Sequence, residues 1–243
     1  MNHGFSMLDE LVGHKSFMQI VILNATGRLV EKRLADWVEA AYGCLSWPDP
    51  RIWCNQVGAL AGQARTTVTA AATAGVLAAD SRAYGQRTIV GGIEFIQSSL
   101  RDHLNGMSIE EIVSAEVVKS RGKPSIVGYA RPIAKGDERI VAMQRVTEKL
   151  GFAQGRHMEL AMGIESLLLK EYQESMNING YVSAFLSDQG FAAEETYAIF
   201  SVLVFSGVVA CFVEYQNKPV NSFLPLRCDD IAYCGPEDRS VID

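Results

Sequence analysis

The sequence lacks the features that mark nucleic-acid-binding and membrane-spanning proteins. Its 28 aspartates and glutamates outnumber its 22 lysines and arginines, which gives the 243 residues a net charge of -6. A phosphate backbone requires a basic surface, so we expect no nucleic-acid partner. The longest apolar segment, residues 198–213, is interrupted by two serines and a glycine. It is shorter than the roughly 20 residues that span a bilayer, so we expect a buried helix or helix pair and no membrane partner.

Cysteine is scarce, and its spacing excludes the common metal motifs. The chain has five cysteines, an odd number, and none lies in a Cys-x-x-Cys or Cys/His cluster: Cys44, Cys54, Cys211, Cys228 and Cys234. We therefore expect no metal site, reduced thiols and a cytoplasmic location. The N-terminus shows no basic stretch followed by an apolar one, so a signal peptide is not expected.

Helical periodicity dominates what is present, and the predicted fold class is all-α. Apolar side chains form one helical stripe from Ile140 to Leu150, which Gly151 ends, and a second stripe over residues 158–168. Ser108 and Glu111 form a capping box, and the alanine-rich residues 66–79 favour a helix. Gly190 is placed as a helix C-cap. No sustained alternation predicts a sheet; residues 126–127 and Ile133 are expected to form short extended pieces at most.

Residues 128–139 combine glycines and a proline with three cations, Arg131, Lys135 and Arg139. The planar fork of arginine suits carboxylates and phosphates, and lysine adds a compact charge. The segment therefore predicts an anion site. The alternative is a solvated basic loop that Asp137 and Glu138 partly neutralise, and composition alone favours that alternative.

The same segment resembles the active-site segment of the citrate synthase and citryl-CoA lyase family, which reads Gly-(Tyr/Phe)-Gly-His-Pro and, shortly after, Gly-Asp-Pro-Arg. The number of matching positions favours the anion site. Arg131 stands where the family has its catalytic histidine. Arginine keeps its proton, so it can polarise or bind a ligand but cannot relay protons.

Two further segments resemble parts of the family's active site. Residues 177–181 match Asn-Val-Asp-Gly, with Asn179 in place of the aspartate that acts as the base. Residues 89–94 match Gly-Pro-x-His-Gly-Gly-Ala more weakly, with Val90 in place of a histidine that binds the thioester oxygen, followed by Gly91. Without the family, the first segment is a turn and helix N-cap, and residues 84–92 form a glycine-containing connection.

The C-terminal part carries a fourth resemblance. Residues 207–214 resemble Gly-x-x-Ala-His-x-x-Glu, with Cys211 replacing the histidine, and Val204 stands where the family has an arginine. Cys211 is either a nucleophile or a buried inert thiol, and we favour the second. Residues 229–237 resemble the Asp-Asp-Ile-Ser-Tyr run of the citryl-CoA lyase module of ATP-citrate lyase, and Arg227 lies where a substrate-binding arginine is common.

The resemblance implies an all-α, two-lobed fold, with a large lobe of about 1–92 and 193–243 and a small lobe of about 93–192. It implies a homodimer that binds a small organic acid, with a CoA thioester as co-substrate and no bound cofactor. General acid and base groups contribute roughly 10²- to 10⁴-fold each. The replacements at Arg131, Asn179 and Val90 therefore argue against ordinary citrate synthesis or citryl-CoA cleavage.

Two functions stay open at this point. The first is a divergent enzyme of a specialised biosynthetic pathway that forms or cleaves a carbon–carbon bond, or decarboxylates, with Arg131 stabilising an oxyanion. The second is a non-catalytic homologue that binds an organic acid or CoA thioester, or pairs with an active relative. Expected catalytic residues are Arg131, Asn179 and, as an alternative acid, Tyr129. Expected substrate-binding residues are Arg139, Lys135, Arg227, Val90 and Gly91. His103 and His157 are expected to be surface or structural residues.

Overall fold

The computed structural model describes residues 1–81, 84–120, 122, 124–131, 136–219, 232, 234, 235 and 237. These residues form one short π-helix and eleven α-helices, with two isolated bridges, Asn2–Phe5 and Tyr129–Met176, and no strand. The all-α prediction is confirmed. The elements are η1 (Met7–Leu11), α1 (Phe17–Thr26), α2 (Lys32–Leu45), α3 (Trp53–Gln63), α4 (Val68–Ala79), α5 (Gln86–Leu104), α6 (Ile109–Lys119), α7 (Glu138–Lys149), α8 (Arg156–Tyr172), α9 (Ile178–Asp188), α10 (Ala193–Ile199) and α11 (Phe205–Gln216).

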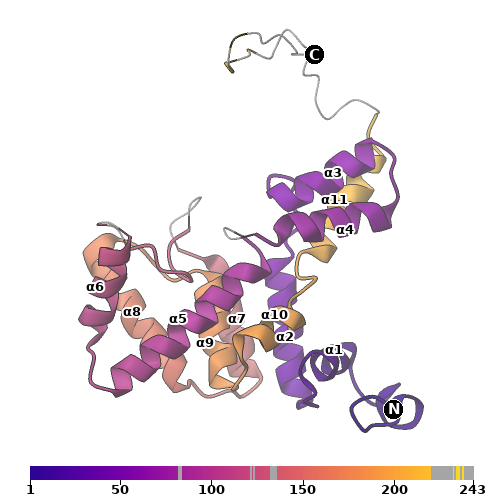
Figure 1. Ribbon diagram of the computed structural model, residues 1–243. Coiled ribbons are helices and arrows are strands. Elements are labelled where there is room, and N and C mark those ends of the chain that lie inside the picture. The colour runs from indigo at the N-terminus through magenta and orange to yellow at the C-terminus, as the bar shows by residue number, and fades with distance from the viewer. Residues whose placement is uncertain are drawn as a thin grey trace, which may run out of the picture.

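The helices gather into two units (Figure 1). The main body contains α1, α2 and α5 to α10, and one large apolar core joins its helices. Trp37 lies fully buried in that core, where it stacks on Phe185 and donates its indole N–H to Thr147 Oγ1 at 2.8 Å. The three-helix unit contains α3, α4 and α11, which pack mainly on one another and project from the main body.

Several local sequence signals produce the structure they predict. Ser108 and Glu111 form the capping box at the start of α6, with bonds of 2.8 and 3.1 Å. The stripe over residues 158–168 faces the core from α8. The stripe from Ile140 lies on α7, although only Met143 is fully buried there. Gly190 follows the end of α9 with a φ of 74°, a conformation that glycine adopts without steric cost.

The interpretation of residues 84–92 as a connection is wrong, because residues 86–92 form the first two turns of α5. Gly85 makes the sharp entry with a φ of 76°. Gly92 lies within α5, and a Cβ there would collide with the Ser183 hydroxyl of α9. Glycine at this position therefore lets α5 and α9 approach closely, and Gly85 alone makes the turn into α5. The predicted boundary near residue 92 falls within α5, and the division into two lobes stays a prediction.

The three-helix unit is held together by close backbone approach. A Cβ on Gly58 would lie 2.5 Å from the Val208 carbonyl oxygen, and one on Gly62 would lie 2.5 Å from that of Phe212. Its own apolar core is small: Cys54, Ala79, Val204 and Val208. The apolar segment 198–213 is a helix pair, with α10 in the main body and α11 in the three-helix unit. In the described part of the chain no helix has the length and apolarity needed to cross a bilayer.

Candidate functional site

The N-terminus of α9 is where the first two predicted segments meet. Asn177 caps the helix by accepting the backbone N–H groups of Asn179 and Gly180 at 2.9 and 3.3 Å. Its side-chain amide donates to the Ala130 carbonyl at 2.7 Å, and its backbone N–H donates to the Gly128 carbonyl at 2.9 Å. The N-cap prediction is confirmed, and the cap also fixes the loop that carries Arg131.

The backbone just before Arg131 is held in an unusual conformation. Ala130 has a φ of 65°, in the left-handed region that residues with a Cβ seldom adopt. Its N–H donates to the Ser175 carbonyl at 2.8 Å, and its carbonyl accepts the Asn177 amide. These two bonds, both to the segment just before α9, hold the strained residue in place and set the direction in which Arg131 leaves the backbone.

The third predicted segment reaches the same place through α5. Asn179 donates its amide N–H to the Thr88 carbonyl at 2.8 Å and accepts the Ser183 hydroxyl at 3.2 Å. Val90 and Gly91 lie one turn further along α5; Val90 is half-buried against the main core, and Gly91 faces Val127. The amide N–H of Asn179 thus joins α9 to α5, whereas its oxygen bonds Ser183 within α9. A carboxylate at this position could not donate to Thr88.

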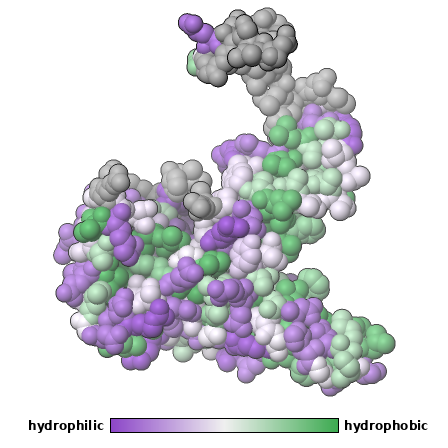
Figure 2. All heavy atoms as spheres, in the orientation of Figure 1, coloured by the Kyte–Doolittle hydropathy of each residue, from purple (hydrophilic) through white to green (hydrophobic). Residues whose placement is uncertain are grey.

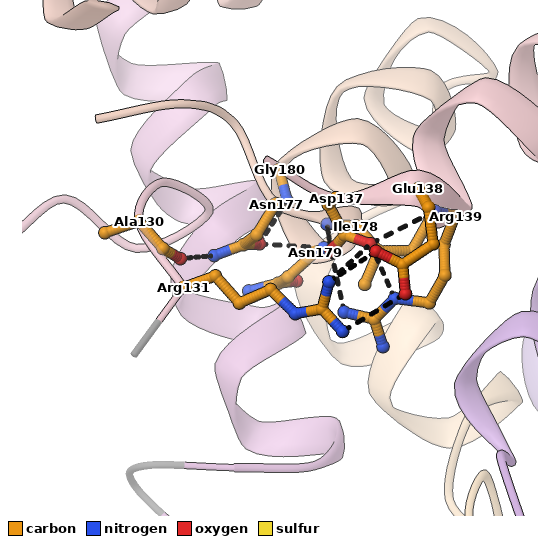
Figure 3. A network of polar contacts seen from close by, with 9 residues as sticks. All are labelled: Ala130, Arg131, Asp137, Glu138, Arg139, Asn177, Ile178, Asn179 and Gly180. Atoms are coloured by element: carbon orange, nitrogen blue, oxygen red, sulfur yellow. Dashed lines mark hydrogen bonds and ion pairs between the residues drawn. The ribbon is translucent and has the colours of Figure 1, made fainter. Parts of the chain in front are cut away.

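Asp137 is the buried centre of the charged network beside this helix start (Figure 3). Its side chain is 0% exposed and accepts the Nε and Nη2 of Arg139 at 2.7 Å each. It also accepts the backbone N–H of Ile178 at 2.9 Å, which ties α7 to α9. Burial alone would raise the pKa of the Asp137 carboxyl, but the bonds and charge of Arg139 hold it below its usual range.

Arg131 points into the same network and pairs with a different carboxylate. Its Nη1 lies 2.6 Å from Glu138 Oε2 and 3.8 Å from Asp137 Oδ1. The hydrogen bond with Glu138 raises the pKa of the guanidinium and lowers that of the Glu138 carboxyl. The Arg131 side chain is 19% exposed, whereas that of Glu138 is 73% exposed. Arg131 therefore pairs with an accessible partner, and Arg139 pairs with a buried one.

Cys44 of α2 and Tyr84 lie close enough to Arg139 for its charge to affect their pKa values. Burial raises the pKa of both groups, and the Arg139 charge opposes that shift in each case. The end of α2 and the residues before α5 therefore lie near Arg139, in addition to the starts of α7 and α9 that Asp137 joins. The paired charges of Arg131, Asp137, Glu138 and Arg139 sum to zero, so a ligand anion has to compete with carboxylates already present.

Tyr129 is fixed in the core. Only 7% of the residue is exposed, and its hydroxyl donates to the Ala161 carbonyl of α8 at 2.9 Å. Burial raises the pKa of the hydroxyl well above its usual value. These contacts hold the loop against α8, and the role of Tyr129 as an alternative acid stays a prediction.

The other predicted residues lie apart from this network or outside the described chain. Lys135 and Arg227 are outside the described residues. Cys211 is buried in α11 of the three-helix unit, and burial raises the pKa of its thiol, which supports the inert-thiol interpretation. His157 bonds Asp188 at 2.9 Å near the start of α8, and His103 is exposed. The described residues contain no His/Cys/Asp/Glu cluster able to hold a metal.

The sequence prediction missed the central roles of Asp137 and Glu138. Both appeared in it only as neutralising charges in the less favoured alternative, and the neutralisation itself is what the structure shows. A signal was present at one position: Glu138 stands where the resembling motif has proline, in the same segment in which Arg131 replaces histidine. A new carboxylate beside a new arginine indicates a pair.

Comparison with solved structures places this geometry in a known fold. No protein-family model matches the sequence, and no curated protein matches it significantly. Citryl-CoA lyase from Hydrogenobacter thermophilus matches with a TM-score of 0.80 and 24% identity, over 99% of this chain and 91% of that one. The chain has the citrate synthase and citryl-CoA lyase fold.

Two further structures of this fold contain ligands. ATP citrate lyase from Methanothrix soehngenii, solved with citrate and coenzyme A, matches with a TM-score of 0.73 and 16% identity, over 92% of this chain and 38% of that one. Citrate synthase from Thermoplasma acidophilum, solved with carboxymethyl coenzyme A and oxaloacetate, matches with a TM-score of 0.67 and 17% identity, over 94% and 59%. The chain thus spans nearly the whole lyase but only part of the two larger proteins.

Proposed function

We propose that this protein is a divergent enzyme of the citrate synthase and citryl-CoA lyase type that acts on a carboxylate or an acyl thioester. Arg131 binds the ligand and stabilises negative charge that develops on an oxygen during carbon–carbon bond formation, cleavage or decarboxylation. A guanidinium that is partly shielded from water stabilises an oxyanion without accepting a proton. Asn179 and Val90 line the approach from α9 and α5, and Arg139 orients the network through Asp137.

The single observation that carries the proposal is the setting of Arg131. Three segments that are separate in the sequence converge on the start of α9, and the strained backbone at Ala130 aims Arg131 at that point. Its partner Glu138 is exposed and can leave without exposing a buried charge. A purely structural arginine needs neither the strain nor an exchangeable partner.

A CoA thioester is the proposed co-substrate, and the support is the fold. Two solved proteins of the same fold hold coenzyme A or a carboxymethyl derivative of it, together with citrate or oxaloacetate. The small organic acid is then the partner that Arg131 binds. No separately bound cofactor is proposed, and the cytoplasmic location stays an expectation.

A second candidate is a homologue that binds an acid or CoA thioester without turning it over. The observation in its favour is that polar groups of the site already bond other protein groups. Both ends of the Asn179 amide are hydrogen-bonded, and Arg139 is paired with Asp137. Neither Asn179 nor Val90 ionises, so neither can serve as the base that the resembling enzymes use.

One screen separates the two candidates. The protein is incubated with oxaloacetate, related 2-oxoacids, citryl-CoA and acyl-CoAs, and new products are sought by mass spectrometry. The enzyme proposal predicts a product whose rate of formation falls about 100-fold or more in Arg131→Ala. Binding without any product favours the second candidate. A product formed equally fast by Arg131→Ala contradicts the role of Arg131.

We also propose that the protein is a homodimer joined through the three-helix unit. The only charged residue in α3, α4 and α11 is Glu214. Between α4 and the start of α11 lies an apolar groove of about 460 Å³, and Leu77 beside it is 70% exposed. A helix with no charged face is normally buried, and the small side chains of α4 allow an identical helix to approach closely.

A further inference from the structure

The two arginines of the site differ in how firmly their carboxylates are held. Asp137 is buried and has three sources of hydrogen bonds: the Arg139 fork, the Arg139 backbone N–H and the Ile178 backbone N–H. Removing it would leave a backbone donor and a guanidinium unpaired in the interior. Asp137 therefore engages the Nε and Nη2 of Arg139 firmly, and a ligand carboxylate would have to compete with it for those two donors.

Glu138 is held differently. It is the first residue of α7, its carboxylate is 73% exposed, and the described side chain that pairs with it is Arg131, at 2.6 and 3.4 Å. An exposed ion pair of this kind is weak and exchanges readily with water. When it separates, the carboxylate is still favourably placed at the N-terminus of a helix. Of the two pairs, this one opens at little cost.

We propose that Glu138 determines ligand specificity at this site: its carboxylate occupies Arg131 until a ligand carboxylate or thioester oxygen displaces it, and then repels any second carboxylate. After displacement, the Glu138 carboxylate stays close to Arg131, because the length of its own side chain limits how far it can move. The four described charges of the network sum to zero, so among the described residues an incoming negative charge is compensated when Arg131 gives up its contact with Glu138. The substrate class is accordingly an acid with a single carboxylate near Arg131, and not a di- or tricarboxylate. This inference rests on the proposed function, since it assumes that ligands bind at Arg131.

The test uses three matched acids that carry one, two and three carboxylates: propanoate, succinate and tricarballylate. Their affinities for the wild-type protein and for Glu138→Gln are measured by NMR titration of ¹⁵N-labelled protein. The wild type is expected to prefer propanoate. Glu138→Gln is expected to gain affinity for tricarballylate by about tenfold, the size expected for removing one like charge a few ångströms away near the surface. The gain should increase with the number of carboxylates.

Glu148→Gln is the matched control, because it removes the same charge from the exposed far end of the same helix. It should bind all three acids as the wild type does. Glu138→Ala repeats the test without a side-chain amide, and the thermal midpoint confirms that each variant is folded.

The outcomes separate this inference from the proposed function. Equal affinities of wild type and Glu138→Gln for all three acids, or a wild type that prefers tricarballylate, overturn the inference. If Arg131→Gln still loses affinity in that case, the proposed function stands. If no acid binds the wild type or either Glu138 variant, both are rejected.

Discussion

The charged network at the start of α7 and the three-helix unit differ in the side chains that they leave exposed to solvent. The network gathers two arginines and two carboxylates in a small space and pairs all four. The three-helix unit has almost no charge and leaves apolar side chains such as Leu77 and Phe205 half exposed or more. In the space-filling view its visible surface is mostly green and white, and purple gathers over the main body (Figure 2).

The two regions also differ in whether contacts within one chain satisfy their side chains. The network satisfies its own charges, so a ligand must replace an internal partner. The three-helix unit buries mainly small side chains and has a small apolar core, so burial of its exposed apolar face would require an outside surface, as the proposed dimer provides. The two proposals accordingly place ligand exchange in the first region and subunit association in the second.

The largest effect is expected from Asp137→Asn. The change removes the charge that Arg139 and the Ile178 N–H share, and it should lower the free energy of unfolding by about 3 kcal/mol. Chemical denaturation followed by circular dichroism measures it. Glu138→Gln, which alters the exposed pair, should cost less than about 1 kcal/mol.

The pH dependence gives an independent check on Asp137. Its folded pKa is lowered, so its contribution is complete above the unfolded value of about 4 and is lost as the pH falls through the folded value. The wild type should lose stability below about pH 4, and Asp137→Asn should lose less over that window. Parallel curves for the two proteins would contradict the role of Asp137.

The next effect concerns association through α4. Leu77→Asp places a carboxylate on the exposed apolar face and should raise the dissociation constant of the dimer about 100-fold, a change of ~2.7 kcal/mol. Sedimentation equilibrium measures it. Val118→Asp is the control, because Val118 is equally exposed on α6 of the main body and should leave the mass unchanged. A wild type that is monomeric at all concentrations refutes the dimer.

Gly62→Ala tests the close approach inside the three-helix unit. Its new Cβ meets the Phe212 carbonyl oxygen and the Gln216 nitrogen, so the unfolding free energy should fall by about 2 kcal/mol. Gly43→Ala in α2 meets no atom within 4 Å and should stabilise the protein by about 0.5 kcal/mol. Equal shifts in the two thermal midpoints would show that α3 and α11 are not in close contact.

A smaller loss of stability than that of Gly62→Ala is expected from Asn179→Asp. A carboxylate cannot donate to the Thr88 carbonyl and would face its oxygen, which should cost about 1–2 kcal/mol. Asn24→Asp is the control, since the Asn24 side chain accepts a hydrogen bond through its oxygen, which aspartate keeps. A stable Asn179→Asp protein would mean that this position tolerates the aspartate of the resembling family.

The sequence predicted what local rules control. The capping box at Ser108, the cap at Asn177 and the stripe on α8 follow from residue type and spacing, and the resemblance named the segments that converge on α9. The sequence-based prediction failed at positions where tertiary packing determines the structure. Residues 84–92 looked like a connection, but residues 86–92 belong to α5, where Gly92 lies against Ser183 of α9. Tyr129 was expected to be an alternative acid, and its burial, with the hydroxyl bonded to Ala161 and the ring against Phe95, could not be read from the sequence. The Glu138–Arg131 pair depends on where α7 begins relative to the loop, which no local pattern encodes.

Arg131 is the proposed anion-binding group of the site. The most direct test is the affinity of Arg131→Gln for propanoate, measured by NMR titration beside the wild type. We predict a loss of at least about tenfold, as expected for removing a charge-assisted contact, with the thermal midpoint unchanged. An affinity equal to that of the wild type would contradict the account and place ligand binding elsewhere in the fold.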